Sequence, residues 1–111
     1  MKAACVFPSD TSKSLYKLTG YILFNQEDKN SNVDVSILIN NIPLGRYGIC
    51  ISEYNCISNI KLKNNKLSIK FMDPLISLFS NDEGCIVNKK LYIYNENINN
   101  VIAEANTFLI F

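Results

Sequence analysis

The chain has 111 residues, 48% of them hydrophobic, and a formal net charge of +1. Its scattered charges form neither the basic stripe of a nucleic-acid-binding protein nor an acidic tail, no apolar run approaches the roughly 18 residues that cross a bilayer, and Pro8 interrupts the start too early for a signal peptide. We therefore expect one soluble intracellular domain over residues 1–111 that binds no nucleic acid and spans no membrane.

Short strands separated by turn residues are predicted along the whole chain. Eight are expected, at residues 2–7, 15–25, 32–40, 44–54, 56–62, 66–72, 85–95 and 106–111. The clearest alternation has an aliphatic residue at every second position from Val33 to Ile39. No segment has a sustained helical period. These features predict an all-β, eight-stranded Greek-key sandwich or flattened barrel.

Two connections between the predicted strands are long. Residues 73–84 include Leu75, Ile76, Leu78 and Phe79, and a loop this apolar is expected to fold back as a plug over one end of the core. Residues 96–104 are rich in asparagine and are expected to form an irregular connection.

The predicted strand at residues 44–54 has two different faces. Ile49 and Ile51 point to one side and are expected in the core. Cys50 and Ser52 lie next to each other on the opposite side. No histidine occurs in the chain, so Ser52 has no imidazole base to activate it.

The absence of histidine also removes the usual metal ligand and general base. The cysteines are Cys5, Cys50, Cys56 and Cys85. Because they contain no C-x-x-C pair, a four-thiolate zinc site is not favoured. In a reducing compartment we expect four free thiols, mostly buried.

Several segments, in the same order, resemble those of the copper/zinc superoxide dismutases. Residues 20–24 resemble the family's glycine-led second strand, and residues 45–54 its copper-ligand strand, Gly-Phe-His-Val-His-Glu-Phe. Residues 75–78 resemble the Val-Ile-Ser-Leu plug. Residues 85–94 follow Cys-Ile-Ile-Gly-Arg-Thr-Leu-Val-Val-His without a gap, and residues 102–105 resemble Leu-Ala-Cys-Gly. The resemblance implies the dismutase sandwich, with shortened metal and electrostatic loops.

The same comparison places other residues at the copper-ligand positions. Cys50 and Ser52 stand where the family has two copper-binding histidines, and Tyr94 where it has the last. The resemblance therefore implies vestigial ligand positions, no bound metal or other cofactor, and no enzymatic activity. Tyr92 and Tyr94 are expected to cover the former copper face.

The resemblance also suggests how the chain meets partners. Cys56 corresponds to the loop cysteine of the family's internal disulfide, but Glu104 occupies the second position. An intermolecular disulfide through Cys56 and an inert free thiol are the two alternatives. The family's dimer surface corresponds to Tyr54, Val87, Asn88 and Phe108, so these are partner-binding candidates and a homodimer is one expectation.

The abundance of asparagine and isoleucine is typical of an AT-rich genome, and the chain is similar to shortened superoxide-dismutase-like proteins of poxviruses. That similarity implies a protein of the host cell cytoplasm, the virion or both. It would act by binding a protein, as a decoy for the host copper chaperone for superoxide dismutase. The alternatives are a structural virion component without chaperone binding, and a residual soft-copper-binding or thiol redox protein.

Overall fold

The structure is a computed structural model that describes residues 1–52, 55–62 and 64–110. The described residues form ten strands: β1 (Lys2–Phe7), β2 (Lys13–Ser14), β3 (Thr19–Asn25), β4 (Val33–Asn40), β5 (Arg46–Ser52), β6 (Asn55–Lys61), β7 (Lys66–Asp73), β8 (Lys90–Asn95), β9 (Asn100–Asn106) and β10 (Phe108–Leu109). In the part of the chain that is described, no helix is long and apolar enough to cross a membrane.

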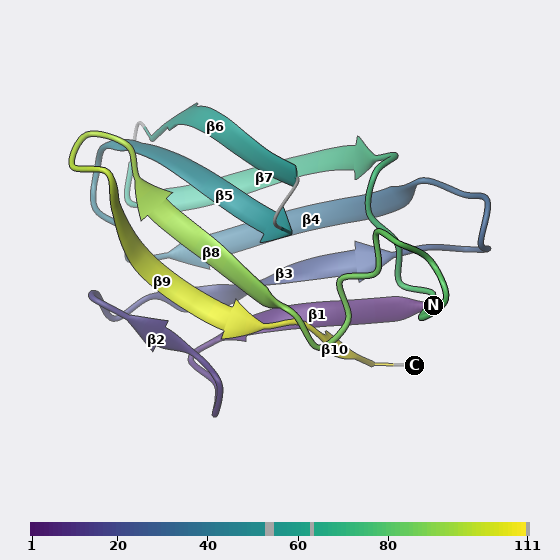
Figure 1. The fold of residues 1–111 in the computed structure, drawn as a ribbon. Coiled ribbons are helices and arrows are strands. Elements are labelled where there is room, and N and C mark those ends of the chain that lie inside the picture. Colours follow the sequence, from purple (N-terminus) through teal and green to yellow (C-terminus); the bar gives the residue numbers. More distant parts are fainter. Residues whose placement is uncertain (53–54, 63, 111) are drawn as a thin grey trace.

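The strands form two antiparallel sheets of five strands each, packed face to face (Figure 1). The first sheet has the order β10-β1-β3-β4-β7, and the second has the order β2-β9-β8-β5-β6. With the short strands included, the chain crosses between the sheets after β1, β2, β4, β6, β7 and β9. The predicted all-β sandwich is therefore confirmed, with two strands, β2 and β9, that were not among the eight predicted.

In β4 every second side chain is buried, which fixes the face of this strand that meets the core. In β4, Val33, Val35, Ile37 and Ile39 are at most 2% exposed. The second sheet contributes residues such as Ile49 to the same core. Each such aliphatic side chain stabilises the fold by roughly 1.5–3 kcal/mol when fully buried. Because one set of side chains is buried in this shared core, the alternate set lies on the outer face of each sheet.

The loop after β7 folds back over the core, as predicted. Ile76 and Leu78 are buried, whereas Leu75 is 69% exposed. The buried side chain of Gln26 holds the loop in place: its Oε1 accepts hydrogen bonds from the Leu78 backbone N–H at 2.7 Å and the Ser77 hydroxyl at 3.2 Å. The glutamine thus satisfies polar groups that the loop buries.

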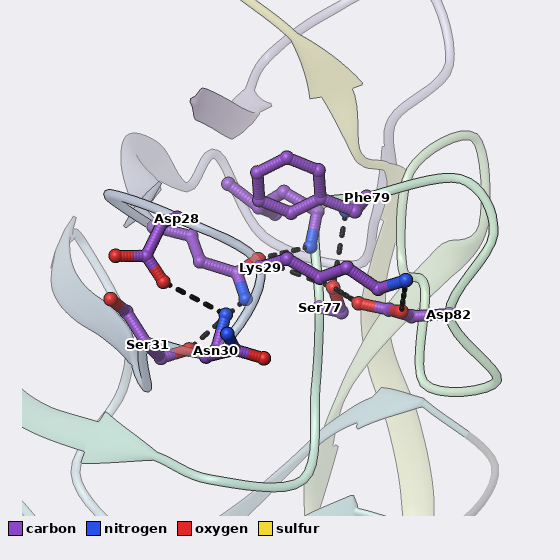
Figure 2. A network of polar contacts seen from close by, with 9 residues as sticks. Asp28, Lys29, Asn30, Ser31, Ser77, Phe79 and Asp82 are labelled. Atoms are coloured by element: carbon purple, nitrogen blue, oxygen red, sulfur yellow. Dashed lines mark hydrogen bonds and ion pairs between the residues drawn. The ribbon is translucent and has the colours of Figure 1, made fainter.

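A polar network continues from this loop toward the surface. Figure 2 shows Ser77, whose hydroxyl lies 2.6 Å from a carboxylate oxygen of Asp82. Asp82 in turn pairs with Lys29, with 3.8 Å between the charged atoms. The Phe79 N–H donates to the Ser77 hydroxyl at 3.1 Å. The network therefore connects the loop to the turn between β3 and β4.

Three predictions in the C-terminal third were wrong. The strand predicted over residues 85–95 begins only at Lys90, because Asn88 has a left-handed backbone (φ 66°) that turns the chain. The connection predicted over residues 96–104 contains most of β9, whose inward residues include Ile102 and Ala105. This strand was not predicted because asparagine, which is abundant here, is uncommon in strands. The closing strand predicted over residues 106–111 is only the two-residue β10.

We expect the Gln26→Ala variant to lower the free energy of unfolding by about 1–3 kcal/mol, because it leaves the buried Leu78 N–H without an acceptor. Urea denaturation measures this. Lys29→Ala is the matched control in the same network. It removes only a surface ion pair and should cost less than about 1 kcal/mol. Equal losses in the two variants would contradict the anchoring role of Gln26.

Candidate functional site

Cys50 and Tyr94, two of the residues that the resemblance places at copper-ligand positions, lie on the outer face of the second sheet. Because Ile49 and Ile51 of β5 are buried in the core, alternation turns Cys50 outward. Across the strands, Cys50 pairs with Cys56 of β6 and with Tyr92 of β8. We call Cys56, Cys50, Tyr92 and Glu104 the Cys50 row, since Glu104 of β9 is the next partner of Tyr92.

Within this row, Cys50 and Cys56 form a disulfide. Cys5 and Cys85 are free. The expectation of four free thiols was therefore wrong. Directly opposite residues of an antiparallel pair bring their Cβ atoms close enough for a disulfide. An intact bond leaves Cys56 no free thiol for an intermolecular disulfide.

Sequence reasoning missed this pair because the register between β5 and β6 is irregular. The pairing shifts between Tyr47 and Ile49 and again between Cys50 and Ser52. Such irregularities depend on local backbone geometry, which no period in the sequence reveals. The close spacing of Cys50 and Cys56 was the available signal, but it does not identify them as cross-strand partners.

Tyr94 lies against the backbone of β5 beside the Cys50 row. Its cross-strand partner is Gly48, and a Cβ atom added to Gly48 would come within 2.2 Å of the Tyr94 ring. Glycine therefore leaves the space that the ring occupies. Tyr94 is half-buried, and Tyr92 is 36% exposed.

Ionic contacts in this region are few. Glu104 pairs with Lys90 at 3.7 Å, so the residue at the position of the family's second disulfide cysteine makes an ion pair. Ser52 ends β5, but its side chain lies outside the described part of the structure. Among residues 1–52, 55–62 and 64–110, no three side chains of the histidine, cysteine, aspartate or glutamate type form a group that could hold a metal ion.

The two free cysteines differ in accessibility. Cys5 points into the core with no exposed surface, and burial raises its thiol pKa to about 12. Because the thiolate is the reactive form, Cys5 is inert at neutral pH. Cys85 is partly exposed, so it is the free thiol that reagents can reach.

Three of the partner-binding candidates, Val87, Asn88 and Phe108, lie in a second region, around the end of β9. The Asn88 N–H donates to the Thr107 carbonyl at 2.7 Å, and the Thr107 N–H donates to the Lys89 carbonyl at 2.9 Å. These bonds bring Val87 and Asn88 close to Phe108, which is 43% exposed. Tyr54, the fourth candidate, lies outside the described residues.

The surface around Phe108 continues across the first sheet. Phe108 pairs with Ala4, which pairs with Leu23 on the next strand. Leu23 is 39% exposed and Ala4 is buried, so two exposed apolar side chains lie on either side of Ala4. Cys56, the remaining candidate, lies on the other sheet in β6 and is not part of this surface.

The overall arrangement matches known structures although the sequence does not. No protein-family model and no curated protein matches the chain. Comparison with solved structures nevertheless identifies its fold as the β-sandwich of copper/zinc superoxide dismutases. A similar structure is the D113N mutant of Candida albicans superoxide dismutase 5, at a TM-score of 0.74 and 16% sequence identity. The alignment covers 99% of this chain and 92% of that one.

The disulfide predicts a specific pattern of thiol labelling. In the native protein without reductant, iodoacetamide should modify Cys85 and leave Cys5 unmodified. Unfolding without reductant should expose only these two free cysteines, and unfolding with reductant should expose Cys50 and Cys56 as well. Mass spectrometry of the alkylated peptides reads this out. Labelling of Cys50 or Cys56 without reductant would contradict the assignment.

Removing the bond should destabilise the protein. The disulfide joins residues six positions apart, and closing so short a loop is worth roughly 2 kcal/mol in the chain-entropy treatment. We expect the double variant Cys50→Ser/Cys56→Ser to lose about that much unfolding free energy in urea denaturation. Wild-type protein measured with reductant should lose a similar amount. If neither the variant nor the reduced wild type loses unfolding free energy, the disulfide does not contribute to stability.

Proposed function

We propose that this protein is a catalytically inactive, metal-free member of the superoxide dismutase class that acts by binding another protein. The observation that carries the proposal is the Cys50–Cys56 disulfide at a position where the resemblance expects a copper ligand. A disulfide sulfur lacks the charge of the thiolate that binds soft metals. Redox-cycling copper needs strong nitrogen ligands, and this chain has no histidine.

The packing around the disulfide supports the same proposal. The Tyr94 ring fills the space over Gly48, and the remaining donors at the vestigial positions are the hydroxyls of Ser52 and Tyr94. Such a donor set does not fit a copper ion that changes oxidation state. What the chain retains is the dismutase fold with a different outer surface.

We infer that the partner is the host copper chaperone for superoxide dismutase, which the protein would occupy as a decoy. The support is that the chain has the dismutase fold and that Val87, Asn88 and Phe108, which the resemblance assigns to the family's dimer surface, lie close together. In this proposal the protein belongs to a poxvirus and acts in the host cytoplasm. A homodimer would use the same apolar surface, so the two associations would compete.

Two further functions each have an observation in their favour. The exposed side chains of Phe108 and Leu23, on either side of the buried Ala4, would suit packing against other proteins of a virion. That function predicts packaging into particles without chaperone binding. Reduction of the disulfide would place the thiols of Cys50 and Cys56 side by side, a pair suited to soft Cu(I). That function predicts copper bound only by the reduced protein.

Metal analysis tests the central proposal. Protein expressed with added copper and zinc should contain neither metal in stoichiometric amount by elemental analysis, and should not accelerate superoxide decay. The Cys50→Ser/Cys56→Ser variant tests the thiol alternative. If reduced wild-type protein binds copper and the reduced variant does not, the copper is bound by this cysteine pair. Stoichiometric metal in the oxidised protein would overturn the metal-free proposal.

Chaperone binding tests the choice of partner. Phe108→Asp places a charge in the apolar surface and should weaken binding of the purified chaperone at least about tenfold, or about 1.4 kcal/mol. Leu15→Asp is the matched control, because Leu15 is also exposed, at 63%, but belongs to another part of the surface. Isothermal titration calorimetry measures the affinities. Absence of binding by the wild type would reject the decoy.

A further inference from the structure

On one flank of the sandwich, two long strands each have an edge that pairs with no other described strand. β6 ends the second sheet and β7 ends the first. They are consecutive in sequence, and both run along the same flank in the view of Figure 1. A hollow of about 370 Å³ lies between them, lined by residues of both strands and of the connecting segment. Unpaired N–H and C=O groups at such edges can pair with another chain.

Among the four edge strands, β7 has the longest regular pairing with its neighbour. Its eight residues pair with β4 in unbroken register from Lys66 to Asp73. The pairing of β6 with β5 is interrupted by two register shifts, and the outer strands β2 and β10 have two residues each. An incoming extended chain therefore finds its longest regular template at β7.

The inward side of this flank is apolar and incompletely covered. Leu67 is buried, but Ile69 and Phe71 are only half-buried. On the opposite side of the hollow, Ile60 and Leu62 are also partly buried and pack against the core. A strand added beside β7 would place every second side chain over these residues. Those side chains should therefore be apolar.

The outward side of β7 has two lysines with Ser68 between them, followed by the exposed Met72 opposite Asp34 of β4. Lys66 and Lys70 are exposed on the same face of β7, and Lys61 also lines the hollow. No acidic residue is among the described residues that line it. A second copy paired antiparallel about Ser68 would place Lys66 against Lys70 of the other copy, and like charges directly opposite are destabilising. Acidic side chains would be attracted at these positions.

We propose that the free edge of β7 is a docking site for an extended acidic segment of another protein, which adds to the first sheet as a strand. The segment would alternate apolar inward residues with outward residues, and would have carboxylates opposite Lys66 and Lys70. This site is separate from the proposed chaperone surface, because Phe108 belongs to β10 at the other end of the same sheet.

A peptide titration followed by amide NMR tests this docking. The probe is a synthetic peptide in which valine alternates with threonine, except for glutamates spaced to meet Lys66 and Lys70. Amide shifts should be confined to the β6–β7 flank, and β7 amides should gain protection from hydrogen exchange. The same peptide with lysine in place of glutamate should bind at least about tenfold more weakly.

Charge-reversed proteins provide the matched comparison. Lys66→Glu/Lys70→Glu should reverse the preference and favour the lysine peptide. Lys13→Glu/Lys17→Glu changes the net charge equally at exposed positions elsewhere and should leave the preference unchanged. A glutamate peptide with N-methyl groups on alternate residues keeps its charge but cannot pair along an edge, so it should lose binding.

Three results would overturn the proposal. The first is no amide shift with the glutamate peptide. The second is equal binding of the N-methylated peptide, which would reduce the contact to charge attraction alone. The third is tighter binding of a single-stranded oligonucleotide than of the peptide at the same lysines, which would make the flank a general polyanion surface.

Discussion

The alternation of side chains along β5 is the constraint on which the outer face of the second sheet depends. Tyr47, Ile49 and Ile51 are each at most 1% exposed, and the Tyr47 hydroxyl donates to the Pro43 carbonyl at 2.7 Å. Sliding the strand by one residue would exchange these side chains for Gly48 and Cys50 and empty the core. The core therefore fixes Cys50 on the outer surface, whatever chemistry that surface has.

Two cross-strand contacts hold the outer face of the second sheet together. The Cys50–Cys56 disulfide ties β5 to the edge strand β6, while the Tyr94 ring packs on Gly48 and ties β8 to β5. These contacts leave the dismutase fold intact because they use cross-strand positions that the sheet already provides. Such a scaffold can keep its shape while its surface chemistry changes, which is why fold and activity are separate questions here.

The sequence predicted most elements whose core pattern is simple. Residues 2–7 agree with β1, residues 66–72 differ from β7 by one residue, and the plug around Ile76 and Leu78 was anticipated. The predictions were wrong where backbone geometry decided the outcome. A left-handed Asn88 delays β8, and the end of β9 leads into a change of sheet at Thr107. Neither the left-handed backbone of Asn88 nor the change of sheet at Thr107 can be predicted from amino-acid composition.

At β5, the sequence by itself determined that Ile49 and Ile51 face inward and Cys50 outward, because a strand's side-chain period is two residues. It also determined that no imidazole is available anywhere in the chain. Only the tertiary structure decided that Cys56 lies opposite Cys50, because two register shifts set that pairing. The contacts of Tyr94 with Gly48 and of Gln26 with Leu78 were likewise decided there. Each of these contacts joins strands or loops whose mutual placement follows from packing the whole core.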